Sequence, residues 1–155
     1  MFRFFGRFLP ARDVGSAPFW GRLAYRYVEA LIASGSQFRL VSTTPVDFGR
    51  HSLWHAWSER FVADVGGCFM NVVCENAQAA EHLWSDGMVN VAIAAVEFEG
   101  QDLPWASYSK YDYVIAPSES QLKALLAVGV GAVVVRDGIG DYLRDIERLR
   151  LKEAP

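Results

Sequence analysis

The chain has 155 residues, a formal net charge of −3 and a sequence pI of about 5.6. Hydrophobic residues make up 52% and charged residues 21%, a composition that excludes an intrinsically disordered chain and suits a domain with its own core. The slightly acidic balance gives no reason to expect a nucleic-acid partner. No apolar run reaches the ~18 residues of a membrane span. We therefore expect one domain over residues 1–155, with no nucleic-acid partner and no membrane span.

The two cysteines, Cys68 and Cys74, lie in a segment that is predicted to be a strand. An extended chain would separate their Cα atoms by roughly 20 Å, which is too far for a disulfide. We expect both to be reduced core residues, and reduced thiols are typical of the cytoplasm. The predicted location is therefore cytoplasmic.

The first part of the chain predicts a β-loop-α-β unit. Residues 2–9 form the first strand, which Pro10 ends; arginines interrupt this segment too often for a secretory signal. Apolar residues then recur at steps of three and four over residues 20–32, the period of an amphipathic helix, and Gly35 is placed to end it. A short apolar strand follows at 38–42. This unit typically opens a parallel α/β sheet.

The remainder predicts four further strands and three helices. Ser118 with Gln121 three residues later is a capping-box pattern at a helix start. The expected strands are 69–74, 88–98, 113–116 and 132–135, and the expected helices are 77–84, 118–128 and about 141–153. The alternation predicts right-handed crossovers and a three-layer, Rossmann-like α/β domain with a mostly parallel sheet.

Residues 43–67 are the hardest segment to assign. If they are helical, His51, His55 and Glu59 share one face, as in helices that bind zinc. The H-E-x-x-H pattern is missing, and no second cluster of ligands supports a metal site. We therefore predict a surface or half-buried face here and no metal.

Polar residues and glycines fall at the predicted ends of several strands. In an open parallel sheet, ligands bind beyond the carboxyl ends of the strands, so we predict a site at that edge, although loops are commonly polar and rich in glycine for other reasons. The candidate substrate-binding residues are Gly15, Ser16, Glu99, Trp105, Ser118, Glu119, Asp137 and Gly138.

Two of these segments have a specific chemical interpretation. Backbone N–H groups near Gly15, at the start of the first helix, can hold an anion or a sugar hydroxyl. Glu99 followed by Leu103, Pro104 and Trp105 combines a carboxylate for hydroxyl groups with an indole for the C–H face of a sugar. The G-x-G-x-x-G fingerprint, the Walker lysine and the G-x-S-x-G elbow do not occur, so no cofactor and no serine-hydrolase chemistry are predicted.

Four segments together resemble a known family. They are Gly15-Ser16 through Trp20-Gly21-Arg22, Glu99 with Leu103-Pro104, Tyr111 through Ser118, and Val133-Val134-Val135 with Gly138-Ile139. In this order and spacing they resemble the N-terminal, acceptor-side domain of retaining GT-B glycosyltransferases of the family-4, glycogen-synthase-like group. The resemblance implies half of a GT-B fold that binds a sugar-containing acceptor. It identifies no catalytic residue and no site for the donor nucleotide.

Three hypotheses about function stay open at this point. The chain is half of a glycosyltransferase that pairs with a donor-binding chain or with itself; or a non-catalytic module that binds a sugar, a nucleotide or another protein; or a small α/β enzyme of unrelated chemistry. Fold alone does not choose among them. We prefer a glycosyltransferase-like domain that is inactive when alone.

Overall fold

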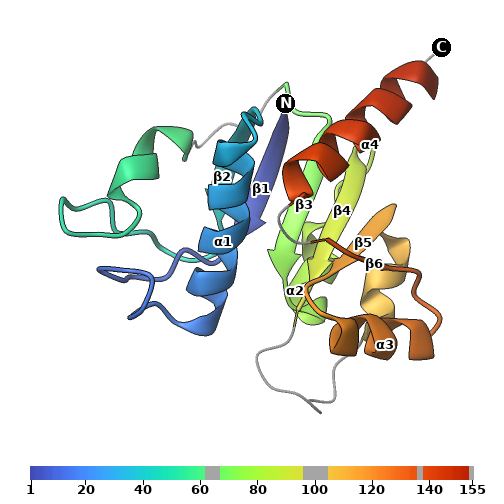
Figure 1. Ribbon diagram of the computed structural model, residues 1–155. Helices are drawn as coiled ribbons and strands as arrows, with labels where there is room; N and C mark the ends of the chain where they lie inside the picture. The colour runs from blue at the N-terminus through green and yellow to red at the C-terminus, as the bar shows by residue number, and fades with distance from the viewer. Residues whose placement is uncertain (62–66, 96–104, 136–137, 154–155) are drawn as a thin grey trace.

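A parallel six-stranded sheet forms the centre of the computed structural model, which describes residues 1–61, 67–95, 105–135 and 138–153 (Figure 1). The strand order is β2-β1-β3-β4-β5-β6, and every pairing between these strands is parallel. The strands are β1 (Phe2–Gly6), β2 (Phe38–Ser42), β3 (Met70–Glu75), β4 (Val89–Ala94), β5 (Tyr113–Ala116) and β6 (Val133–Val134). The predicted α/β class and Rossmann-like sheet are confirmed.

Helices cover both faces of the sheet. They are α1 (Phe19–Ala33), α2 (Ala77–Leu83), α3 (Glu119–Ala127) and α4 (Ile139–Glu153), with two short 3-10 helices, η1 (His55–Arg60) and η2 (Trp105–Lys110). Side chains alternate along β3: Val72 packs in the core under α1 and α4, and Val73 packs in the core under α2 and α3. The domain is therefore a three-layer sandwich with a separate apolar core on each face of the sheet.

The first strand is shorter than the predicted 2–9. Gly6 O accepts a hydrogen bond from Thr43 N at 2.9 Å, but Phe8 N turns to the Ser42 hydroxyl at 3.4 Å. The Phe8 side chain is fully buried against the rings of Trp54 and Phe61. Pairing along β1 thus ends at Gly6, before the predicted end of the strand, because the next residues pack against a loop instead.

Most other boundaries lie within a residue or two of the prediction. Gly35 follows α1 with a φ of 71°, and Ser118 caps α3 by accepting a hydrogen bond from Gln121 N at 3.4 Å, as predicted. Helix α4 begins at Ile139, slightly earlier than expected. The predicted strand over 88–98 is β4 from Val89 to Ala94; residues 96–98 lie outside the described residues.

The segment after β2 is mostly loop and contains the short helix η1. Trp54 is its anchor: the indole is fully buried, and Nε1 donates to Leu9 O at 2.8 Å. Phe61 makes an isolated parallel bridge with Leu40 of β2. With this bridge counted as a rudimentary outer strand and all strands renumbered in chain order, the sheet reads 3-2-1-4-5-6-7, which contains the 3-2-1-4-5-6 order of dinucleotide-binding Rossmann folds.

We expect Trp54→Phe to lower the free energy of unfolding by about 1–3 kcal/mol, because it leaves a void and leaves the part-buried Leu9 carbonyl without its donor. Urea denaturation measures this change. Trp84→Phe is the matched control: Trp84 is 36% exposed, so its variant should stay within about 0.5 kcal/mol of the parent. Equal losses in the two variants would show that Trp54 does not anchor this segment.

Both cysteines are free thiols in the structure. Cys74 is buried in β3, and burial raises the pKa of its thiol far above the ordinary value, which keeps it protonated. Cys68 precedes β3 and is half-buried. Within the described ranges, no helix has both the length and the apolar character to cross a membrane.

Candidate functional site at the carboxyl edge of the sheet

The strand order places a topological switch point between β1 and β3. From β1 the chain crosses to β2 on one side of the sheet, whereas β3 leads to β4 on the other side. Open parallel sheets bind ligands in the crevice beyond the carboxyl ends of the two strands at such a point. Phe5 of β1 is in register with Val73 of β3, so Arg7 and Glu75, two residues further on, lie opposite each other there.

Arg7 and Glu75 form a tightly bonded ion pair. Nε of Arg7 lies 2.9 Å from Oε1 and 2.8 Å from Oε2 of Glu75, and Nη2 lies 2.7 Å from Oε1. The Glu75 side chain is 2% exposed and that of Arg7 is 25% exposed. A buried carboxylate is costly without such partners, so the pair fixes the guanidinium in one orientation at the edge of the sheet.

Two further donors complete the surroundings of the carboxylate. The Thr43 hydroxyl donates to Oε2 of Glu75 at 2.8 Å, and Asn76 N donates to Oε1 at 3.0 Å. The Arg7 guanidinium also lies over the Trp20 ring, 4.6 Å from its centroid, which adds a cation–π contact. Three segments, after β1, β2 and β3, thus converge on one carboxylate.

Tyr108 anchors the carboxyl end of β3. Its hydroxyl donates to Glu75 O at 2.7 Å, and the residue is fully buried in the core under α2 and α3. Burial raises the pKa of this phenol well above its ordinary value, so the hydroxyl keeps the proton that it donates. A buried hydrogen bond therefore holds the backbone of Glu75, in addition to the bonds that hold its side chain.

The predicted residues Gly15 and Ser16 lie in a turn before α1. Ser16 N donates to Oδ1 of Asp13 at 2.8 Å, and the Ser16 hydroxyl donates to Asp13 O at 3.2 Å. All three residues are exposed. The turn follows β1, and the side chains of Asp13 and Ser16 already form hydrogen bonds within it.

Ser118, Glu119 and Trp105 lie further along the sheet. Ser118 and Glu119 follow β5, three strand spacings from β1, which is roughly 14 Å. Trp105 is half-buried and packs against the core under α2 and α3, with its ring 6.3 Å from that of Tyr108. Part of its indole surface is thus occupied by folding contacts.

The predicted residue Gly138 does not reach this edge. It immediately precedes α4, where Gly140 packs against Ser34 and lines a hollow at the amino ends of β1 and β2. The chain returns there after β6 because α4 packs on the same face as α1. The other two predicted residues, Glu99 and Asp137, lie outside the described residues.

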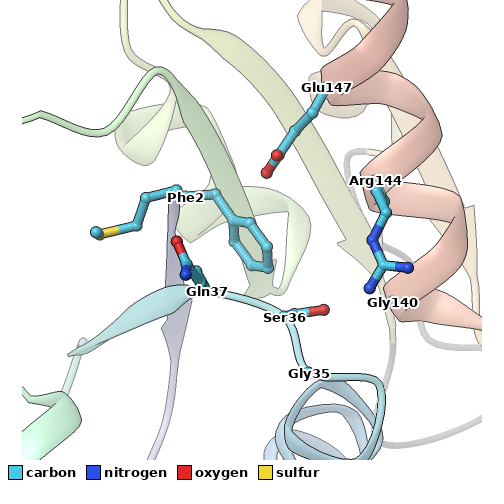
Figure 2. Close-up of a pocket in the computed structure, with 8 residues that line it drawn as sticks. Phe2, Gly35, Ser36, Gln37, Gly140, Arg144 and Glu147 are labelled. Carbon is cyan, nitrogen blue, oxygen red and sulfur yellow. The ribbon is translucent and has the colours of Figure 1, made fainter.

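Figure 2 shows this amino-end hollow, which has a volume of about 230 Å³. Phe2, Ser36 and Gln37 line one side of it, and Arg144 and Glu147 of α4 line the other. Arg144 already donates to Ser34 O at 2.9 Å and lies near Asp141. The hollow is at the end of the sheet opposite the switch point, and its arginine ties α4 to α1.

Sequence reasoning missed Arg7, Thr43 and Glu75. A signal was present: Arg7 directly follows the last residue of β1, and Glu75 ends β3, whose other residues are mostly apolar. A charge that ends a buried strand is expensive without a partner, so two such charges on neighbouring strands indicate a pair. Finding it requires knowing that β1 and β3 are neighbours.

Comparisons with protein families, with curated proteins and with solved structures find no match to this chain. Across the described part of the chain, no group of three or more His, Cys, Asp or Glu residues could hold a metal ion. What remains to indicate a function is the arrangement of Arg7, Thr43 and Glu75 at the switch point.

Proposed function

We propose that this chain is a glycosyltransferase-like domain that binds a sugar-containing ligand in the crevice between β1 and β3. The observation that carries the proposal is the Arg7–Glu75 ion pair, which lies at the switch point with the Thr43 hydroxyl bonded to the same carboxylate. The resemblance of the sequence to acceptor-binding domains supplies the ligand class. The rudimentary strand at Phe61 adds support, because it extends the sheet to the Rossmann order.

The chemistry of the crevice favours hydroxyl groups as partners. The Glu75 pair holds the Arg7 guanidinium in a fixed plane, and the exposed Thr43 has a hydroxyl that both donates and accepts. The charge of Arg7 is balanced by Glu75, so the pair as a whole is neutral. A neutral, hydrogen-bonding crevice suits a sugar better than it suits a free anion or an apolar ligand.

The same contacts argue for binding without catalysis by this domain alone. Both oxygens of Glu75 accept hydrogen bonds, so the carboxylate is not placed to remove a proton from a ligand. The thiol of Cys74 is buried and protonated, because burial raises its pKa. Transfer of a sugar then requires a donor-binding chain, or a second copy of this one, to supply the reacting groups.

Calorimetry with neutral mono- and disaccharides and with UDP- and GDP-sugars tests the proposal. Thr43→Val should weaken binding of the responding sugar about threefold to tenfold, since it removes one hydrogen bond. Ser36→Ala, at the opposite end of the sheet, is the matched control and should bind as the parent does. Absence of sugar binding, equal affinity of the two variants, or unaided sugar transfer would overturn the proposal.

A further inference from the structure

A second hollow lies on the loops that leave β1 and β2. Its volume is about 430 Å³, and it is lined by residues 10–12 on one side and by Asp47 and residues 49–52 on the other. Both loops follow the carboxyl ends of their strands (Figure 1). The hollow is therefore at the same end of the sheet as the switch point between β1 and β3. It shares no residue with the Arg7–Glu75 pair.

The walls of this hollow are held in place by hydrogen bonds. Leu53 N donates to Ala11 O at 2.9 Å and the indole of Trp54 donates to Leu9 O at 2.8 Å, so the two loops are tied together. Ser52 N donates to Gly49 O at 2.8 Å, and His55 Nδ1 lies 3.0 Å from Phe48 O. A ligand would therefore meet walls that are already ordered, which lowers the entropic cost of binding.

The hollow concentrates positive charge in a chain whose net charge is −3. Arg12 and Arg50 line it from opposite loops, and neither has a hydrogen bond or ion pair among the described residues. Its acid, Asp47, is engaged locally, because Oδ1 accepts a hydrogen bond from Gly49 N at 2.8 Å. His51 also lines the hollow. Two guanidinium groups and one carboxylate thus lie beside one cavity, and within the described residues neither guanidinium is paired with an acid.

We propose that this hollow binds a phosphoryl group of the ligand. Guanidinium groups hold phosphate oxygens through paired N–H donors, and two of them from opposite walls match a tetrahedral anion. The cavity is large enough for a phosphate with part of the group that it esterifies. If the proposed function holds, the ligand is a phosphorylated sugar that spans the crevice and the hollow, so the identity of the sugar rests on that function. Binding of the phosphoryl group in the hollow does not depend on it.

Titration with inorganic phosphate tests the hollow alone. We expect ¹H–¹⁵N NMR shifts at residues 11–12 and 49–52, and we expect these shifts to become smaller as sodium chloride is raised. The double variant Arg12→Gln/Arg50→Gln should reduce the affinity at least tenfold, because each charge-assisted hydrogen bond contributes about 1.5–3 kcal/mol. Both residues are exposed, so the variant should remain folded. Arg26→Gln, an exposed arginine of α1 away from this hollow, is the control and should bind as the parent does.

Further probes separate this inference from the proposed function. Glucose 1-phosphate should bind more tightly than glucose or phosphate alone, and lose affinity in both Thr43→Val and Arg12→Gln/Arg50→Gln. Vesicles with and without phosphatidic acid distinguish a phosphoryl group on a lipid from a free one. Binding through the same arginines supports the assignment in either case.

The outcomes are distinct for the two proposals. Phosphate binding that depends on the two arginines, without any sugar binding, supports the hollow and overturns the sugar crevice. Sugar binding that depends on Thr43, with no response to phosphate or to phosphatidic acid, does the reverse. Phosphate binding that is equal in the double variant and in the Arg26→Gln control shows nonspecific ion association and overturns the hollow.

Discussion

Replacing Arg7 with glutamine should lower the free energy of unfolding by about 2–4 kcal/mol, because one partner of a largely buried ion pair is lost. Glu75 is 2% exposed, and Arg7 supplies three of its short contacts, at 2.9, 2.8 and 2.7 Å. The side chain of Arg7 is 25% exposed, so water reaches the vacated space and limits the loss. Urea denaturation followed by tryptophan fluorescence measures the change.

The double variant Arg7→Met/Glu75→Met shows whether the loss comes from the stranded carboxylate. With both charges gone, no buried ion remains to be solvated, and apolar side chains of similar length fill the space. We expect the double variant to recover at least half of the stability that Arg7→Gln loses. A double variant that is less stable than Arg7→Gln would contradict the role assigned to the pair.

Gly140→Ala should lower the free energy of unfolding by about 2–3 kcal/mol, the upper part of the range for overpacked interfaces. A Cβ atom at this position would lie 1.9 Å from Ser34 Oγ and 2.5 Å from Ser34 Cβ, so one of the two helices must shift. Alanine is the better helix former by about 1 kcal/mol, but this gain is smaller than the cost of the overlap. Thermal unfolding measures the loss as a lower Tm.

Two controls isolate the contact between α1 and α4. Gly131→Ala adds the same methyl group where nothing lies within 4 Å, so its stability should change by less than about 0.5 kcal/mol. Ser34→Gly/Gly140→Ala removes both overlapping atoms of Ser34 and should be more stable than Gly140→Ala alone. If the added Ser34→Gly change gives no recovery, the loss does not arise from this packing contact.

The elements that depend on local sequence were predictable from the chain alone. The apolar period over residues 20–32 predicts nearly the whole of α1. Gly35, which adopts a positive φ just after the helix, marks its end. Ser118 caps α3 through the expected bond to Gln121 N. The apolar run of β5 matches the predicted 113–116. In each of these cases the determining residues lie within a few positions of one another.

The features that depend on distant residues were not predictable. The end of β1 is set by Ser42 and Trp54, which pack on the residues after Gly6. The place of Gly138 depends on where α4 packs, because α4 contacts α1 on one face of the sheet.

The candidate site shows the same division. The alternation of strands and helices predicts a candidate site at the carboxyl ends of the strands, and Gly15 and Ser16 do lie in the loop after β1. The Arg7–Glu75 pair spans 68 positions of sequence, so only the neighbouring register of β1 and β3 brings the two charges together. Local patterns therefore indicate the edge that carries the candidate site, and the three-dimensional pairing indicates the centre proposed for it.

The most direct test of the account is a ¹H–¹⁵N NMR spectrum of the protein with the sugar that binds most tightly in calorimetry. Ligand in the crevice should shift the Arg7 Nε–H signal and the backbone amides of Thr43 and Asn76, which lie around the Glu75 carboxylate. Shifts confined to Ser36, Gln37 and Arg144, around the amino-end hollow, would place the ligand at the opposite end of the sheet and contradict the assignment.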